Sequence, residues 1–326
     1  MKFDRLIAAA AIAVGFAGTV SAQELKFASF TPPFHTINAS VIEKLNADVS
    51  AATDGALTVQ GYHGGELGAG PLEQYVRVVQ GAADMSWGLP GYTSSQFEKT
   101  MIAELPGAIP DDMAGYEALW AAFDSELVGE FPATKALALW TSEPNIFIMR
   151  ETAIRTPEDL AGLKVRVAGA TAAEVATALG ATPVQMPMTE VYNAMQTGLI
   201  DGVITGVSVL TDFKLNEVTG AVTIGAPLGR LTFYTVMNQG VYDGLGDAEK
   251  AALDEASGMS LSKSAEDAWN AVADEALAAA RENDAIEVVD LSEDEQAAFA
   301  EAVADVVDSY VARVGGESAL AALRGE

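Results

Sequence analysis

The stretch that decides the fold is Thr156-Pro157-Glu158-Asp159-Leu160-Ala161-Gly162-Leu163-Lys164-Val165-Arg166-Val167. Thr156 is a typical helix N-cap, and Pro157 suits the first helical position, followed by two acids that match the positive end of a helix dipole. After Gly162, residues 163–167 alternate apolar and basic side chains, as a β-strand does. A helix is expected next, over 172–179. The order helix, strand, helix predicts an interior strand of a mostly parallel α/β sheet.

The same order of strands and helices continues on both sides of this stretch. Towards the N-terminus, the apolar periodicity predicts strands and helices in turn over residues 25–30, 37–52, 57–62 and 71–80. Nearer the middle, two strands are expected at 136–140 and 145–150. On the C-terminal side, Thr189 is expected to cap a helix from Glu190 to about Gly198. This alternation predicts two α/β units in one chain.

Beyond these units the pattern changes to long acidic helices. Residues 247–283 are rich in Ala, Glu and Asp, and only Gly258 interrupts them. Ser292 and Glu295 form a capping box for a last helix that reaches about Val314. The apolar positions keep no sustained heptad, so these helices are expected to pack on the α/β units and not to form a coiled coil.

Composition excludes several classes of function. The 326 residues include 46 Asp or Glu against 18 Lys or Arg, a formal net charge of −28. Such a chain is not expected to bind nucleic acid, because phosphate contacts need a basic face. Cysteine is absent, which excludes disulfides, thiol nucleophiles and Cys-ligated metals. The length suits about two domains.

The N-terminus, residues 1–22, reads as a cleavable secretory signal. Lys2 and Arg5 precede the apolar run 6–20, and Val20-Ser21-Ala22 supplies small residues at a cleavage site. The alternative is an uncleaved membrane anchor, but the run is short for a span of ~20 residues. The mature protein is therefore expected to be exported and to begin near Gln23.

No catalytic constellation is visible in the sequence. The only histidines are His35 and His63, too few for a histidine metal site with the usual close spacing, and no nucleophile-elbow, P-loop or calcium-loop motif occurs. A hydrolase that pairs His35 with an acid would lack a nucleophile motif. His35 could line a site, and an ordinary loop histidine is at least as well supported. We therefore expect no enzyme activity, no cofactor and no metal.

Arg166 is the residue that most needs an explanation. It faces away from Leu163, Val165 and Val167, near the C-terminal end of its strand, where open α/β sheets hold ligands. Its planar fork suits a carboxylate. The alternative is a structural ion pair with one of the many acidic residues. On spacing alone, ligand binding and a structural ion pair are equally well supported.

Aromatic residues in loops are further candidates for a binding site. Trp87 and Tyr92 flank the turn Gly88-Leu89-Pro90-Gly91 just after an expected strand. Phe147, Phe213, Phe233 and Tyr234 complete the set, although most large aromatics belong to the core.

With these features in place, the sequence resembles the periplasmic solute-binding proteins of tripartite ATP-independent periplasmic (TRAP) transporters, the group named for its dicarboxylate-binding members. The segments that carry the resemblance are residues 156–166, Leu179-Gly180-Ala181-Thr182-Pro183, Met186-Pro187-Met188-Thr189-Glu190-Val191-Tyr192, Met195-Gln196-Thr197-Gly198-Leu199-Ile200-Asp201-Gly202, Val236-Met237-Asn238, Gly64-Gly65-Glu66-Leu67-Gly68 and Val79-Gln80-Gly81-Ala82-Ala83-Asp84-Met85. Together they extend over nearly the whole chain after the leader.

The resemblance implies a two-lobed α/β periplasmic-binding-protein fold that closes over one small ligand. It implies lobe I over 23–145 with a returning segment near 235–250, lobe II over 146–234, and long helices over 247–326 that pack on both lobes. It also implies a periplasmic receptor without catalysis, which hands its solute to membrane permease subunits. By motif match, Arg166 falls on the carboxylate-clamping arginine of the family and Asn238 on its ligand-facing asparagine.

One departure from the family bears on the ligand. Members that bind sugar acids carry a second arginine where this chain has Asn145-Ile146-Phe147-Ile148, and Thr205-Gly206-Val207 replaces a common Glu-Asn pair. A single cation with apolar walls favours a small monocarboxylate with an apolar or aromatic body. Sugar acids, dicarboxylates, or a receptor role for an ATP-driven importer or chemosensor remain alternatives. The candidate ligand-binding residues are Arg166, Asn238, Trp87, Tyr92, Phe34, Asn145, Phe147 and Phe213.

Overall fold

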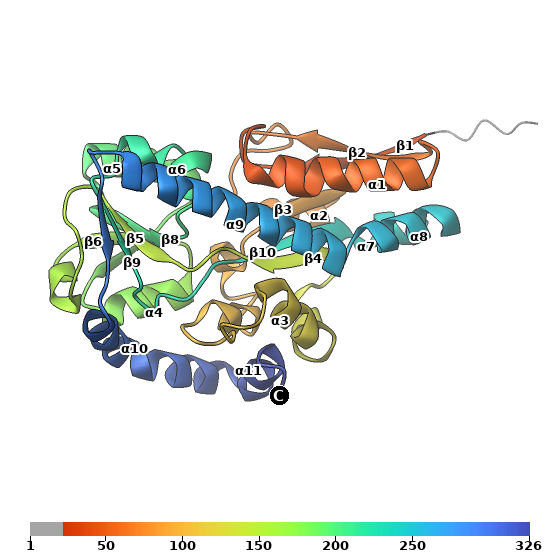
Figure 1. Cartoon of the computed structure of the whole chain (residues 1–326). Helices are drawn as coiled ribbons and strands as arrows, with labels where there is room; N and C mark the ends of the chain where they lie inside the picture. The colour runs from red at the N-terminus through yellow and green to blue at the C-terminus, as the bar shows by residue number, and fades with distance from the viewer. Residues whose placement is uncertain (1–21) are drawn as a thin grey trace, which may run out of the picture.

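The computed structural model describes residues 22–326 and contains two β-sheets, each covered by helices (Figure 1). The expected leader therefore lies outside the described residues, apart from Ala22. We call the part built on the first sheet the first lobe and the part built on the second sheet the second lobe. Within residues 22–326, no helix is both long and apolar enough to cross a bilayer.

The first sheet has five strands in the order β2-β1-β3-β10-β4. Their bounds are β1 Gln23–Ala28, β2 Leu57–Tyr62, β3 Met85–Gly88, β4 Thr134–Thr141 and β10 Thr232–Asn238. β1 is parallel to β2 and β3, whereas β10 is antiparallel to β3 and β4. The chain thus returns to the first lobe through β10, a strand that begins at Thr232.

The second sheet has six strands in the order β11-β9-β5-β8-β6-β7. Their bounds are β5 Ile146–Met149, β6 Lys164–Val167, β7 Thr182–Gln185, β8 Gly202–Thr205, β9 Ala221–Ile224 and β11 Glu287–Asp290. β6 lies between β7 and β8 and is parallel to both, which confirms the interior parallel strand expected at 163–167. β11 was not expected, because it lies in a short segment between two long helices.

The helices follow the expected order with some shifted ends. The α-helices are α1 Lys44–Ala52, α2 Gln74–Val79, α3 Gly115–Ala122, α4 Ala170–Ala178, α5 Met188–Thr197, α6 Val209–Asp212, α7 Gln239–Gly244, α8 Asp247–Ala256, α9 Met259–Glu282, α10 Glu293–Val314 and α11 Glu317–Leu323. Gly258 separates α8 from α9, and Ser292 accepts a hydrogen bond from the Glu295 backbone N–H, as expected. α5 begins before Thr189, so that residue lies inside the helix and not at its cap.

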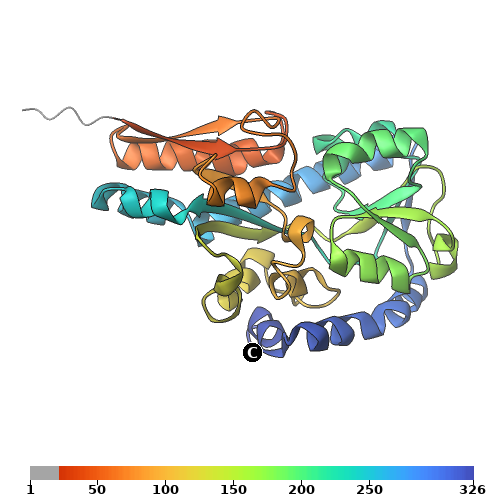
Figure 2. The same cartoon turned by 180° about the vertical axis from the view of Figure 1, so that it is seen from behind.

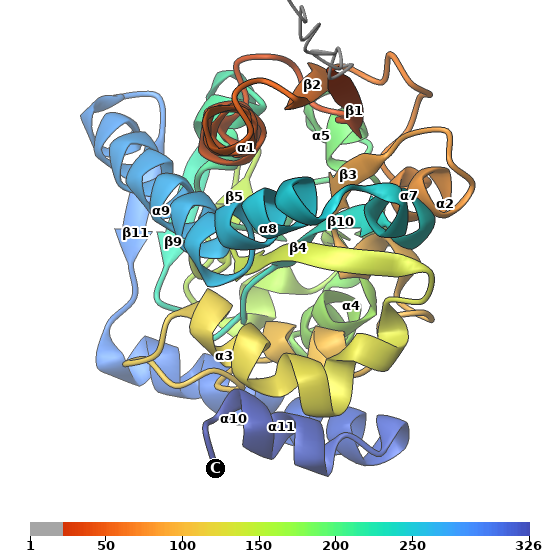
Figure 3. The same ribbon diagram turned by 90° about the vertical axis from the view of Figure 1, so that its right-hand side faces the viewer.

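Two long helical segments connect the lobes. α9 runs along both of them (Figures 1 and 3), packing on β4 at one end and on β11 and α6 at the other. Leu261 and Trp269 of α9 belong to the core of the first lobe, and Ala276 and Ala280 to a core of the second. On the opposite side, α10 and α11 extend beneath both lobes (Figure 2), with α10 against α4 and α11 against α3.

The chain also crosses between the lobes at residues 142–145 and 225–231, and these two crossings run next to each other. The backbone N–H of Ser142 donates to the Leu231 carbonyl at 2.8 Å, and that of Asn145 donates to the Gly229 carbonyl at 2.9 Å. The crossings form the floor of the space between the lobes, since Ser142 and Leu231 both line the cavity described next.

Candidate functional site

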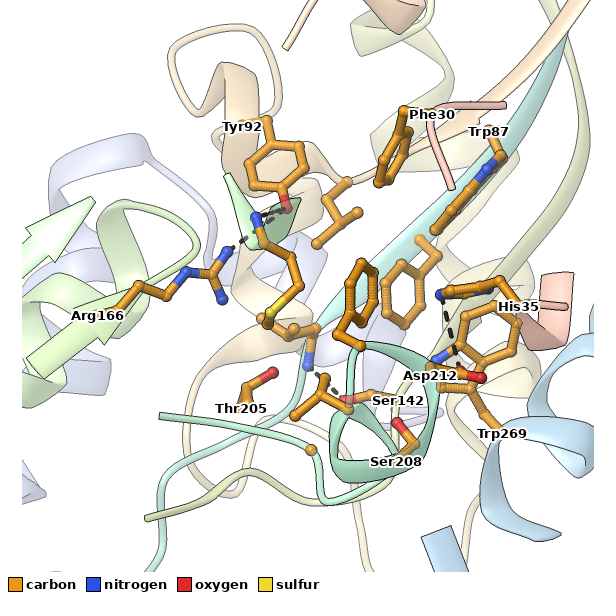
Figure 4. A pocket seen from close by; sticks show the side chains of 17 residues that line it. Phe30, His35, Trp87, Tyr92, Ser142, Arg166, Thr205, Ser208, Asp212 and Trp269 are labelled. Atoms are coloured by element: carbon orange, nitrogen blue, oxygen red, sulfur yellow. Dashed lines mark hydrogen bonds and ion pairs between the residues drawn. The ribbon is translucent and has the colours of Figure 1, made fainter. Parts of the chain in front are cut away.

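A cavity lies between the two lobes and is shown in Figure 4. It is lined by Phe30, His35, Trp87, Leu89, Tyr92, Ser142, Arg166, Met188, Thr205, Gly206, Ser208, Val209, Asp212, Phe213, Leu231, Phe233 and Trp269. The cavity volume is about 40 Å³, smaller than the roughly 150 Å³ of a protein cavity that accepts benzene. The lobes are therefore closed tightly in this structure.

Arg166 lies on one side of this cavity with its charge unpaired. The residue is fully buried at 0% exposure. Its Nε donates to the Met186 carbonyl at 2.9 Å and its Nη2 to the Tyr92 hydroxyl at 3.4 Å, while Nη1 has no hydrogen-bond partner within residues 22–326. No salt bridge to Arg166 occurs in that part of the chain. Burial lowers the pKa of this guanidinium, and the neighbouring Tyr92 opposes the shift.

The hydroxyl of Tyr92 completes one side of the arginine site. Besides facing Arg166, its oxygen accepts a hydrogen bond from the Met188 backbone N–H at 3.0 Å. With both contacts directed at the oxygen, the hydroxyl proton is available to a further acceptor. Tyr92 belongs to the 3-10 helix Pro90–Thr93 of the first lobe, so this contact joins the two lobes.

Thr205 adds a second hydroxyl on the same face of the sheet. In register, Arg166 is opposite Val203 on β8, and Thr205 is two residues further along that strand. Side chains two residues apart in a strand share a face. The Thr205 hydroxyl is buried without a hydrogen-bond partner among the described residues and lines the cavity. It is therefore a second polar group available to a ligand near Arg166.

Aromatic rings make up much of the remaining wall. Phe30 stacks on Trp87 with ring centroids 4.5 Å apart, and Trp87 lies 6.1 Å from Trp269 of α9. Phe233 packs against Trp269 at 5.3 Å. Phe213 contributes from the second lobe. Such rings bury large apolar areas and prefer stacked or edge contacts with other rings.

His35 and Asp212 form a polar pair on the side of the cavity away from Arg166 (Figure 4). Both side chains are buried, and His35 Nε2 lies 3.7 Å from Asp212 Oδ2. Burial lowers the pKa of His35 to about 3 and raises the pKa of Asp212 to about 6. Near neutral pH the histidine is thus uncharged and the aspartate is mostly ionised.

Further contacts join the two lobes directly. Thr36 of the first lobe donates through its hydroxyl to Asp212 Oδ2 of the second at 2.9 Å. Gly91 and Gly169 bring the two backbones so close that a Cβ on Gly169 would lie 2.6 Å from the Gly91 Cα. Glycine is required at position 169 because a side chain would have no space there. The backbone angle does not require it, since Gly169 has an extended φ of −153°.

A buried carboxyl group also lies between the lobes, outside the cavity. Glu104 accepts hydrogen bonds from the Thr232 backbone N–H at 3.1 Å and from the Thr171 hydroxyl at 2.9 Å. Burial raises the pKa of Glu104 to about 7.

No group of three or more His, Cys, Asp or Glu side chains that could hold a metal ion gathers anywhere in residues 22–326.

Four of the eight candidate residues meet in the cavity. Arg166, Tyr92, Trp87 and Phe213 line it, and the two lobes bring them together from distant parts of the sequence. The other four, Phe34, Asn145, Phe147 and Asn238, do not line it, and their surroundings explain why.

The two asparagines make structural hydrogen bonds elsewhere. Asn238 caps α7 by accepting from the Val241 backbone N–H at 3.1 Å, and it donates to the Val78 carbonyl at 2.8 Å. Asn145 donates to the Leu228 carbonyl at 3.2 Å in the crossing between the lobes. In this structure Asn238 therefore caps a helix and does not line the cavity, and its ligand-facing role stays a prediction.

The two phenylalanines also lie away from the cavity, one in the core and one on the surface. Phe147 is completely buried and packs on Phe299 of α10, 5.7 Å between centroids, so it belongs to the core. Phe34 is 63% exposed, and the Lys214 ammonium lies 5.9 Å from its ring centroid. Neither side chain faces the cavity.

Sequence reasoning missed several lining residues, above all Phe30, Asp212 and Trp269. Trp269 lies in the segment 247–283, for which the sequence predicts only packing on the α/β units, whereas its helix runs along both lobes and brings this ring to the cavity. Asp212 was one of 46 acids with no distinguishing motif. Phe30 follows β1, and its place at a strand end was the one signal that could have marked it.

The comparison with known sequences agrees with this architecture. Residues 27–313 match the family of bacterial extracellular solute-binding proteins, family 7. The C4-dicarboxylate-binding periplasmic protein of Rhodobacter capsulatus is 32% identical over 187 residues, 56% of this chain and 54% of that protein, so the chain spans about half the length of this relative. The ectoine-binding periplasmic protein of Halomonas elongata is 28% identical over 269 residues, 79% of this chain and 76% of that protein.

Solved structures match the fold over almost its whole length. A TRAP solute-binding protein of Rhodoferax ferrireducens in complex with benzoate has a TM-score of 0.85 and 27% identity, covering 93% of this chain and 97% of that one. A marine metagenome TRAP solute-binding protein specific for aromatic acid ligands, in complex with 3-hydroxybenzoate, has a TM-score of 0.86 with the same identity and coverage. The chain belongs to family 7 of the bacterial extracellular solute-binding proteins and is a solute-binding protein of the TRAP transporter type.

Proposed function

We propose that this protein binds a small monocarboxylate with an aromatic body and delivers it to a TRAP permease. The observation that carries the proposal is Arg166, a fully buried cation without an acidic partner among the described residues. An isolated buried charge is costly unless a counter-charge and hydrogen bonds compensate it. A ligand carboxylate supplies both.

Three groups suit the two oxygens of such a carboxylate. Arg166 Nη1 is a free charged donor, and the hydroxyls of Tyr92 and Thr205 have protons to donate. Hydrogen bonds between a guanidinium and a carboxylate are stronger than those between neutral groups. When the lobes close, water leaves the cavity and the attraction between the charges increases. The ligand thereby stabilises the closed form.

The walls favour an aromatic body for this acid. Phe30, Trp87 and Phe233 offer faces and edges to a ring. A dicarboxylate would need a second cation, and Arg166 is the only Lys or Arg among the lining residues. The two solved relatives described above hold benzoate and 3-hydroxybenzoate, which supports this ligand class. Because the cavity is smaller than a ring requires, the lobes must open to admit the ligand and must close around it less tightly than in this structure.

A second candidate ligand is a zwitterion. Asp212 provides a carboxylate on the side of the cavity away from Arg166, and aromatic faces beside it attract cations. The Halomonas elongata relative is named for ectoine. This candidate predicts that a ligand with a positive group binds more tightly than benzoate.

Isothermal titration calorimetry tests the proposal directly. Benzoate, ectoine, succinate and glucuronate are titrated into the purified protein and into Arg166→Ala and Arg166→Lys. We expect benzoate to bind, Arg166→Ala to lose about 3–5 kcal/mol of binding free energy, more than a hundred-fold in Kd, and Arg166→Lys to bind clearly more weakly because the fork is lost.

The matched control is Arg155→Ala, which removes an exposed ion pair with Glu295. It should bind benzoate as the unmodified protein does. Unchanged benzoate affinity in Arg166→Ala would refute the proposed role of the arginine. Binding of glucuronate or succinate alone would refute the proposed ligand class.

The proposal includes export to the periplasm, where the named relatives act. Expression of the full chain in a Gram-negative host should give a periplasmic protein whose N-terminal sequence begins at or near Gln23. Uptake of the ligand into membrane vesicles that contain the TRAP permease encoded beside this protein should require the purified protein. Recovery of the uncleaved chain from the cytoplasm would contradict the export step.

A further inference from the structure

His35 has one ring nitrogen occupied by the backbone and one directed elsewhere. Its Nδ1 accepts a hydrogen bond from the Ile37 backbone N–H at 3.1 Å. A nitrogen that accepts in this way carries no proton, so the proton of the neutral ring is on Nε2. The burial that lowers the pKa of His35 to about 3 keeps the ring neutral at physiological pH.

This Nε2–H group has no good partner in the described part of the chain. Asp212 Oδ2 lies 3.7 Å from this nitrogen, too far for a normal hydrogen bond. Three aromatic rings surround the imidazole, with centroid distances of 5.5 Å to Trp87, 5.2 Å to Phe213 and 5.4 Å to Trp269. Rings of this kind offer no oxygen acceptor.

Asp212 provides an acceptor next to this donor. Thr36 fixes its carboxyl group through two contacts from the hydroxyl, 3.0 Å to Oδ1 and 2.9 Å to Oδ2, and a third from the backbone N–H at 3.4 Å. Each carboxylate oxygen has two lone pairs, so capacity remains for one more donor. Asp212 and His35 together line the cavity.

We propose that His35 and Asp212 form a second recognition point that binds a hydroxyl group on the ring of the ligand. The hydroxyl would accept from His35 Nε2–H and donate to Asp212, while Arg166 holds the carboxylate on the other side of the cavity (Figure 4). This inference rests on the proposed function and narrows it to aromatic acids with a hydroxyl remote from the carboxylate.

A cationic group satisfies the pair less well. An ammonium or a quaternary nitrogen could approach Asp212, but it offers no lone pair to His35, and the Nε2–H would stay buried and unsatisfied. A hydroxyl is both donor and acceptor and therefore matches both residues. A bare ring matches neither, and its binding would leave the His35 Nε2–H without a partner and the remaining acceptor capacity of Asp212 unused.

The test compares benzoate with 3-hydroxybenzoate, 4-hydroxybenzoate and mandelate by calorimetry on the full mature protein. The measured quantity is the ratio of the benzoate Kd to the Kd of each hydroxy acid, so that changes common to all ligands cancel. We expect one of the ring-hydroxylated acids to bind about ten-fold more tightly than benzoate, the effect of one well-made hydrogen bond. Mandelate, whose hydroxyl is beside the carboxylate, should show no such gain.

Two substitutions at His35 separate its ring nitrogens. His35→Asn keeps an acceptor near the Nδ1 position and removes the Nε2–H donor, so the ratio should fall to about one. His35→Gln places an amide N–H near the Nε2 position and should keep most of the preference. Thermal unfolding of each variant checks that it folds. If a variant does not fold, the ratio of Kd values in the unsubstituted protein still tests whether the site prefers a ring hydroxyl.

Each outcome has a distinct meaning. Equal affinities for benzoate and both ring-hydroxylated acids in the unsubstituted protein would overturn this inference and leave the proposed function standing. Tighter binding of ectoine than of any aromatic acid would overturn both in favour of the zwitterion. A hydroxyl preference that survives His35→Asn would overturn the assigned role of His35.

Discussion

The Tyr92 hydroxyl oxygen lies 3.4 Å from Arg166 Nη2 and 3.0 Å from the Met188 backbone nitrogen, so one side chain of the first lobe contacts two groups of the second. The contact exists only when the lobes are close together. Tyr92 therefore couples closure of the lobes to the position of the arginine that we assign to the ligand carboxylate.

Tyr92→Phe should weaken ligand binding while leaving the fold intact. The change removes one hydroxyl, which leaves Met188 N–H without its acceptor and the carboxylate without one donor. We expect a loss of about 1–2 kcal/mol, roughly ten-fold in the Kd of benzoate, measured by calorimetry. Tyr192→Phe is the matched control, because the Tyr192 hydroxyl donates to Glu217 on the exposed surface. Equal effects of the two changes would argue against the coupling.

Gly169→Ala should hinder closure of the lobes. The new Cβ would meet the Gly91 Cα of the other lobe at 2.6 Å, and backbone atoms there cannot move aside without separating the lobes. Overpacking of this kind costs about 1–3 kcal/mol, so the Kd of benzoate should rise about ten-fold or more. Small-angle scattering should show a ligand-bound form more open than that of the unsubstituted protein.

The control for this change is Gly129→Ala, since a Cβ on Gly129 meets nothing within 4 Å. It should leave both the Kd and the scattering curve unchanged. A Gly169→Ala protein with unaltered affinity would show that the two backbones separate without cost.

Glu104→Gln should alter how the free energy of unfolding depends on pH. The folded-state pKa of Glu104, about 7, is above its unfolded value of 4.5. Its contribution to stability is therefore fully present below pH 4.5 and is lost as pH rises through 7. A glutamine avoids this loss and can still accept from the Thr232 N–H.

Thermal unfolding at pH 5 and pH 8 measures this effect. The Tm of Glu104→Gln minus that of the unsubstituted protein should be more positive at pH 8 than at pH 5, by an amount equivalent to about 3 kcal/mol or less. Glu158→Gln, at an exposed position, serves as the control. A Tm difference that does not change with pH would mean that Glu104 titrates normally.

Asn238→Ala should lower stability without lowering affinity. The side chain caps α7 and holds the Val78 carbonyl, and loss of a helix cap costs about 0.5–2 kcal/mol. Because Asn238 does not line the cavity, the Kd of benzoate should stay within experimental error while the Tm falls. A large increase in Kd at an unchanged Tm would restore the ligand-facing role that its sequence motif suggested.

The sequence was sufficient for the features that depend on local pattern. Strand 163–167, the break at Gly258 and the capping box at Ser292 all follow from periodicity and end signals within a few residues. Arg166 was identified in the same way, because a cation at the end of a buried strand contradicts the pattern around it. The resemblance to a family added the two-lobed fold, which the fold comparison confirms.

The remaining features depend on distant parts of the chain. His35 and Asp212 are 177 positions apart in the numbering (212 − 35) and meet only across the closed lobes. Trp269 reaches the cavity because α9 spans both lobes, which its sequence pattern does not reveal. For Phe147 the sequence suggested a place in the binding site. The structure instead buries it in the core, although its strand begins next to a segment that crosses between the lobes.

The ring cluster beside the cavity has a practical consequence. The chain has four tryptophans, and three of them, Trp87, Trp140 and Trp269, lie within 6.1 Å of Phe233 between ring centroids. Two of these three, Trp87 and Trp269, also line the cavity. The fourth, Trp120, donates a hydrogen bond to Ser262 outside it. An arriving ring would change the surroundings of two indoles, so the intrinsic emission of the protein should make it an unlabelled optical sensor of its own solute.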